Sequence, residues 1–173
     1  YAGSAIQCDL AAGRGRIALR PDEAILLIHA VNCHGFAWGR RVTEEGCDLN
    51  RNFIDFDTAL PANDGYDELA PLLVPAALDA ETIAAAEAGI AAYRARHGER
   101  AFQIARKSGQ YRHPHGMFYG GTAPSAARLR LERIARAARL DDRAFVTIVD
   151  VHTGLDPFGY GEPQSEHGVD SVS

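Results

Sequence analysis

The sequence has no excess of positive charge, little cysteine and no long apolar run, and each of these features argues against a class of protein. The net charge is −5 at pH 7, which argues against nucleic acid or an anionic membrane as the main partner. No apolar run approaches the roughly 20 residues of a membrane-spanning helix. The three cysteines lack Cys-x-x-Cys spacing, so they predict free thiols rather than disulfides or a thiolate metal site, and favour a cytoplasmic location.

Two continuous apolar segments are the strongest indications of the fold in this sequence. Residues 24–31 and 145–151 are typical of strands buried on both faces of a sheet, and the second is rich in β-branched side chains. With 46% of 173 residues hydrophobic, the chain has enough apolar material for one core.

Helical patterns lie before and between these segments. Residues 79–97 form an apolar face behind a capping Asp79 and end at Gly98, and a second helix opens at Pro124 and Ser125 and runs to about residue 138. Shorter helices are expected near both 1–12 and 100–107, whereas 61–75 and 108–122 carry turn residues and predict long loops. The alternation predicts residues 1–173 to be a single layered α/β domain with a mixed, mostly parallel sheet.

The most informative polar segment is 41–53, directly after the first predicted strand and turn. Arg41 and Arg51 flank a run in which Asn50 and Asn52 add neutral donors and acceptors. Arginine grips a carboxylate through two parallel hydrogen bonds, so the cluster predicts a pocket for an anionic group. The alternative is that both arginines are surface cations paired with nearby acids; the candidates are Glu44, Glu45 and Asp48.

His152 stands at the end of the second predicted strand, with Asp150 two positions earlier on the same face. Ligands collect at the carboxyl ends of strands in open α/β sheets, so His152 and the 41–53 segment are expected at one edge. The imidazole is either a metal ligand whose tautomer a carboxylate fixes or a buried histidine bonded to the backbone.

Several segments together resemble the zinc metallocarboxypeptidases. The run Asp-Leu-Asn-Arg-Asn-Phe at 48–53, with an arginine nine positions before its first asparagine, is similar to that family's substrate clamp, and Asp-Val-His-Thr-Gly at 150–154 to its zinc-ligand turn. The wording at 63–69 and 111–121 looks closest to an uncharacterised bacterial carboxypeptidase-like branch.

The resemblance implies roles for individual residues. Asn50 and Arg51 would hold the substrate's terminal carboxylate, and Arg41 would polarise the scissile carbonyl and steady the oxyanion, with Arg40 the competing candidate. His152 would be one ligand of a single zinc ion. Tyr160 would line the mouth of the pocket or serve in packing.

The same resemblance implies that part of the catalytic machinery lies elsewhere. The family's first two zinc ligands form a His-x-x-Glu pair, which this sequence does not contain, and no residue here matches its general-base glutamate. We therefore expect an internal part of a longer enzyme, incomplete at both ends of the catalytic domain. The expected activity is zinc-dependent hydrolysis of a C-terminal peptide or amide bond, in a peptide or acyl-amino acid with a free carboxylate. The alternatives are an N-acyl amino acid amidohydrolase and a non-catalytic carboxylate-binding module.

Overall fold

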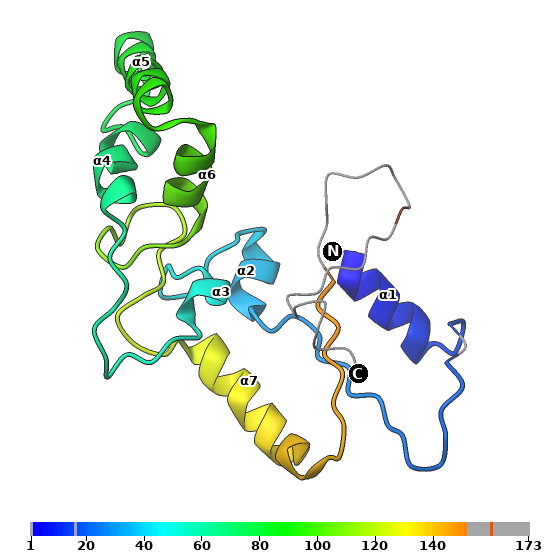
Figure 1. Cartoon of the computed structure of the whole chain (residues 1–173). Helices are drawn as coiled ribbons and strands as arrows, with labels where there is room; N and C mark the ends of the chain where they lie inside the picture. The colour runs from blue at the N-terminus through cyan, green and yellow to red at the C-terminus, as the bar shows by residue number, and fades with distance from the viewer. Residues whose placement is uncertain (1, 16, 152–159, 161–173) are drawn as a thin grey trace. The chain divides into compact units, whose positions relative to one another are not determined.

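The computed structural model describes residues 2–15, 17–151 and 160 and divides the chain into two compact units (Figure 1). The first unit comprises Tyr1–Glu23 with Thr147–Ser173, and the second comprises Ala24–Val146. The second contains six of the α-helices of the described residues and all of the polar segment at 41–53.

The predicted α/β sheet is wrong for the part of the chain that the structure describes. Its elements are helices, and the only β-pairing there is two isolated bridges, Val42 with Asp48 and Gln110 with Tyr119. Residues 24–30 and 145–151 are not assigned to strands, and side chains such as Ile25 (45% exposed) and Ile148 (83% exposed) face solvent. Apolar composition predicts that a segment prefers burial, but a strand also needs a neighbour that pairs its backbone groups.

The first unit has one described helix, α1 (Ala2–Ala11), which confirms the helix predicted near residues 1–12. Gly3 on this helix faces the 147–151 segment, since a Cβ added there would lie 3.5 Å from Cβ of Val151. This distance is an ordinary van der Waals contact, so the helix and the segment pack against each other here.

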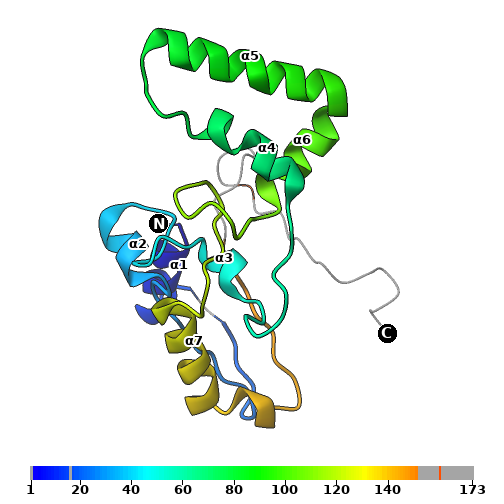
Figure 2. The same cartoon turned by 90° about the vertical axis from the view of Figure 1, so that its left-hand side faces the viewer.

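The core of the second unit is built by three helices (Figure 2): α4 (Asp64–Leu73), α5 (Ala80–His97) and α6 (Glu99–Lys107). Leu69, Tyr93, Phe102 and Ala105 are buried together, and Leu72, Leu73 and Ile90 pack around them. Burying each large apolar side chain stabilises the fold by about 1.5–3 kcal/mol, so this cluster is the main hydrophobic anchor of the unit.

Local capping explains where the predicted helices begin and end. The carboxylate of Asp79 accepts a hydrogen bond from the Thr82 amide at 2.8 Å, and α5 ends at Gly98, whose φ of +82° suits glycine. Helix α7 (Ala126–Ala137) begins at Ser125, whose side chain accepts a bond from the amide of Arg128. The predictions at 79–97, 100–107 and 124–138 are thus confirmed to within one or two residues.

Helix α4 lies within 61–75, which we predicted to be a loop. The Asn63 side chain caps it by accepting a bond from the Tyr66 amide at 3.0 Å and donating to the carbonyls of Ala105 and Gly109. Pro71 stands in the last turn of α4, where it removes one backbone hydrogen bond of the helix. No helix among the described residues is long and apolar enough to cross a membrane.

Two short helices hold the polar segment in place. Asn32 caps α2 (Cys33–Trp38), and its amide group also donates to the carbonyls of Arg41 and Val42 at 3.1 and 3.0 Å. Gly39, with φ of +61°, ends α2 and turns the chain back toward its start. Helix α3 (Leu49–Asn52) follows, and the 3-10 turn η1 (Leu140–Asp142) comes after α7.

The side chain of Asn52 joins α3 to the segment that leads into α7. It is fully buried and donates to the carbonyls of Gly120 and Ala123 at 2.8 and 2.9 Å, while its oxygen accepts from the Ser125 amide at 2.8 Å. Arg128 adds bonds from α7 to the carbonyls of Asn52 and Ile54. Every polar atom of this amide is therefore satisfied without water.

Asn52→Asp should lower the free energy of unfolding by roughly 2–4 kcal/mol, because it replaces two buried donors with carboxylate oxygen that faces two carbonyls. Asn50→Asp, at an exposed position on the same helix, should change it by no more than about 0.5 kcal/mol. Urea unfolding followed by circular dichroism measures both. Equal stability of the two variants would contradict the structural role of Asn52.

Candidate functional site

Arg41 forms an ion pair with Asp48, one of the three acidic residues that the sequence offered as partners. Its Nε lies 2.8 Å from Oδ2 of Asp48, and Asp48 is almost completely buried while the Arg41 side chain is 59% exposed. Among the described residues Glu45 instead accepts a bond from the Ala126 amide, at the start of α7. The pairing therefore fixes Arg41 side-on against a buried carboxylate.

Asp48 is itself fixed from three directions. Its Oδ1 accepts a bond from the Asn50 amide at 3.1 Å, which caps α3, and its own amide donates to the carbonyl of Tyr119 at 2.7 Å. The isolated bridge to Val42 brings the two ends of the 42–48 turn together. A carboxylate held in this way gives Arg41 a stationary partner.

The other contacts of Arg41 leave one edge of its guanidinium open. Its central carbon lies 5.2 Å from the centroid of the Phe118 ring, within the range of a cation–π interaction. Within the described part of the chain, neither terminal nitrogen of Arg41 has a hydrogen-bond partner. Because Nε is occupied by Asp48, the edge formed by the two terminal nitrogens is the one available to a ligand.

Arg51 is used more heavily by the protein itself. Its Nη2 donates to the carbonyl of Lys107 at 2.9 Å, and its Nε is buried without a hydrogen-bond partner. Gly109, with φ of +91°, lies so close that an added Cβ would stand 2.6 Å from Cδ of Arg51. The Arg51 side chain therefore packs against Gly109, and only part of its guanidinium group is available to a ligand.

Of the remaining predicted site residues, Asn50 belongs to the same compact unit as Arg41 and Arg51. Asn50 is exposed on α3, next to Arg51. Tyr160 is 68% exposed and belongs to the other compact unit, and His152 lies outside the described residues.

The described residues do not supply a donor set for zinc. Over residues 2–15, 17–151 and 160, no three histidine, cysteine, aspartate or glutamate side chains are grouped as a metal ion requires. The cysteines are free, as predicted: Cys8 and Cys33 are exposed and Cys47 is buried, and burial raises the pKa of the Cys47 thiol.

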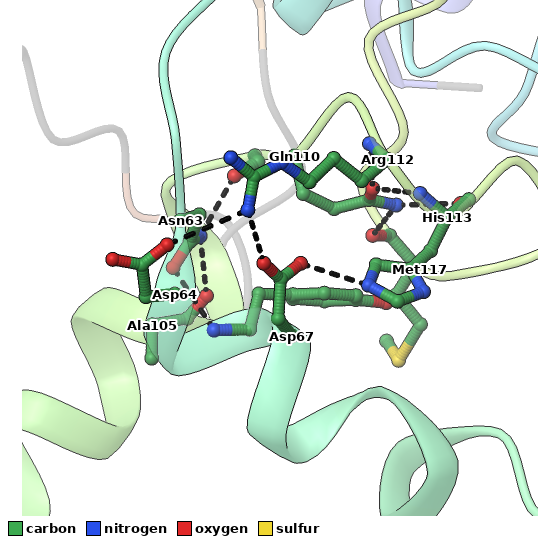
Figure 3. A network of polar contacts seen from close by, with 10 residues as sticks. Asn63, Asp64, Asp67, Ala105, Gln110, Arg112, His113 and Met117 are labelled. Carbon is green, nitrogen blue, oxygen red and sulfur yellow. Dashed lines mark hydrogen bonds and ion pairs between the residues drawn. The ribbon is translucent and has the colours of Figure 1, made fainter.

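Sequence reasoning missed a polar network between α4 and the 108–122 segment (Figure 3). The Asp67 carboxylate lies between Arg112 Nη1, at 2.6 Å, and His113 Nε2, at 2.8 Å. The hydrogen bond with His113 is the largest cause that lowers the pKa of Asp67 from its ordinary 3.8; burial opposes it and Arg112 adds to it. The spacing of Asp67 from both partners, about 45 residues, leaves no local signal for this contact.

Gln110 gives the same segment a fixed shape. Its buried side chain accepts bonds from the amides of Arg112 and His113 and donates to the carbonyls of His113 and Met117. Its backbone exchanges bonds with Phe118 and Gly120. The segment that we predicted as a long loop is therefore closed around one glutamine and has no freedom to open as a unit without losing these bonds.

The lowered pKa of Asp67 predicts a loss of stability in acid. A carboxyl group with a lower pKa in the folded state contributes its full stabilisation above the ordinary value of 3.8 and loses it as the pH falls through the lowered value. The stability difference between the wild type and Asp67→Asn should therefore be largest near neutral pH and shrink below 3.8. Urea unfolding at several pH values measures it.

Asp64→Asn is the matched control, since this carboxylate is 90% exposed on the same helix, 3.5 Å from the same Arg112. Asp64→Asn should change the free energy of unfolding little, at neutral pH and in acid alike. A stability difference for Asp67→Asn that grows as the pH falls would contradict the assignment.

Comparison with known proteins gives a family and no described activity. A family model described as "Protein of unknown function (DUF2817)" matches residues 1–172. No curated protein and no solved structure matches the chain. Since the family model covers nearly all of the sequence, the chain belongs to the DUF2817 family.

Proposed function

We propose that this chain is the substrate-carboxylate-binding part of a carboxypeptidase-type hydrolase, with Arg41 as the main contact. The supporting observation is the arrangement of one guanidinium. Its Nε is bound to a buried carboxylate, its face lies near an aromatic ring, and its two terminal nitrogens are without partners among the described residues.

The chemistry of arginine explains why such a group suits a carboxylate. Two terminal N–H groups form two parallel hydrogen bonds with the two oxygens of a carboxylate, and the charge persists at any working pH. Fixing the arginine beforehand reduces the conformational entropy lost when the ligand binds. Asp48 offsets the positive charge of Arg41. Arg51, on the helix that Asp48 caps, supplies a further positive charge near the proposed ligand.

In this proposal the main carboxylate contact is Arg41 rather than Arg51. Arg51 donates to the Lys107 carbonyl and keeps its Nε buried, so we assign it and the exposed Asn50 a supporting role. The free cysteines favour a cytoplasmic location. The resemblance adds a zinc ion with His152 as one ligand and cleavage of the C-terminal peptide or amide bond. These belong to the proposal through the resemblance alone.

Arg41→Ala should weaken the binding of N-acetyl-phenylalanine by about 10- to 100-fold, because it removes charge-assisted hydrogen bonds worth about 1.5–3 kcal/mol. The amide of the same compound, which has no carboxylate, should bind weakly to both proteins. Isothermal titration calorimetry or chemical-shift titration provides the affinities.

Arg40→Ala is the matched control, since the side chain of this adjacent exposed arginine makes no described hydrogen bond or ion pair. It should leave the affinity close to that of the wild type. Equal binding of the acid and the amide, or full affinity in Arg41→Ala, would remove Arg41 from the site.

Hydrolysis separates the enzymes from a binding module. The natural full-length protein that contains this chain, incubated with zinc and either a short peptide or an acyl-amino acid, should release a C-terminal amino acid, and Arg41→Ala in that protein should lower kcat/KM by about 100-fold. Product analysis by mass spectrometry decides whether peptides or acyl-amino acids are preferred, the latter indicating an amidohydrolase. Carboxylate binding without any product would instead support the non-catalytic module.

A further inference from the structure

Phe118 occupies a backbone conformation that ordinarily disfavours a large side chain. Its φ is +55°, in the left-handed region where Cβ crowds the backbone and glycine is preferred. Two other non-glycine residues among those described share this property, Ala30 and Arg139. Strain of this kind persists only where the surrounding structure enforces it.

The surroundings of Phe118 enforce it from both sides. The Gln110 amide donates to the Phe118 carbonyl at 3.1 Å, and the Gly120 amide donates back to the Gln110 carbonyl at 2.8 Å. The Gln110 side chain also donates to the carbonyl of Met117 at 3.3 Å. The backbone on either side of Phe118 is therefore held by Gln110, through bonds that do not involve the Phe118 ring.

The same short stretch reaches both members of the Arg41–Asp48 pair. The Phe118 ring lies 5.2 Å from the guanidinium carbon of Arg41, and the carbonyl of the next residue, Tyr119, accepts the Asp48 amide at 2.7 Å. One end of the pair is thus held by an aromatic ring and the other by the adjoining backbone. Glycine at 118 would remove the strain, and it would also remove the ring.

We propose that Phe118 is a positioning residue that, together with Asp48, orients Arg41 for binding a substrate carboxylate. Asp48 fixes the guanidinium along its Nε edge, and the ring restricts its rotation out of that arrangement. The terminal nitrogens then keep one direction toward the ligand. This inference rests on the proposed function of Arg41 as the carboxylate contact.

Phe118→Gly is the variant that separates positioning from packing. It relieves the left-handed strain, so the unfolding midpoint in urea should stay close to that of the wild type. The affinity for N-acetyl-phenylalanine should nevertheless fall about two- to fivefold, the loss expected for an exposed cation–π contact. Phe118→Tyr keeps the ring and should retain the wild-type affinity.

Two further measurements make the result specific to Arg41. In the Arg41→Ala background, Phe118→Gly should have no additional effect on affinity, since the group that the ring positions is gone. In the single variant, the Nε–H and Cδ–H resonances of Arg41 should shift, because the ring current of Phe118 no longer acts on them. If Phe118→Gly does not fold, Phe118→Asn removes the ring with a side chain that tolerates the left-handed region.

The outcomes distinguish this inference from the proposed function. Weaker binding in Arg41→Ala with full affinity in Phe118→Gly would overturn the positioning role alone. Full affinity in Arg41→Ala would overturn the proposed function and, with it, the role of the ring in carboxylate binding. Arg41 resonances that are unchanged in Phe118→Gly would overturn the positioning role whatever the ligand does.

Discussion

The buried amide of Asn52 is the interaction on which the arrangement of the candidate site depends. It joins α3 to backbone groups of Gly120, Ala123 and Ser125, which are about 70 residues away in sequence. Because a buried amide left without partners costs about 1–3 kcal/mol per unsatisfied group, α3 and this segment hold each other in one register. Asp48, at the start of α3, and Phe118, at the end of the closed loop, are consequently brought to the same side chain, Arg41.

In the second unit, side chains often form the hydrogen bonds that backbone groups make with one another in regular elements. Asn32, Asn63 and Gln110 each satisfy backbone groups of segments that belong to no helix or strand. An amide side chain carries both donors and an acceptor, so it can close a turn that the backbone alone would leave unsatisfied. The Asp48 carboxylate likewise accepts bonds from two elements at once, the Arg41 side chain and the first turn of α3. The site is therefore assembled from loops that are as constrained as regular elements.

The helices predicted from the sequence were confirmed where the capping signal is local. Asp79, Gly98 and Ser125 mark helix ends through bonds that span three or four residues, and those helices appear where expected. The sheet failed because strand pairing is non-local: the segment 24–31 has the composition of a buried strand, yet composition does not provide a partner. Helix α4 was missed because the turn residues of 61–75 predicted a loop, whereas the Asn63 side chain caps a helix there.

The sequence by itself determined which residues carry charge, where α5, α6 and α7 form, and that Arg41, Asn50 and Arg51 stand in one short polar segment. It left open whether Arg41 pairs with Glu44, Glu45 or Asp48. Only the tertiary structure decided for Asp48, placed the Phe118 ring beside Arg41, and turned part of Arg51 toward the Lys107 carbonyl. Partners that are 56 or 77 residues apart meet only after the chain between them has folded, and no local spacing encodes that meeting.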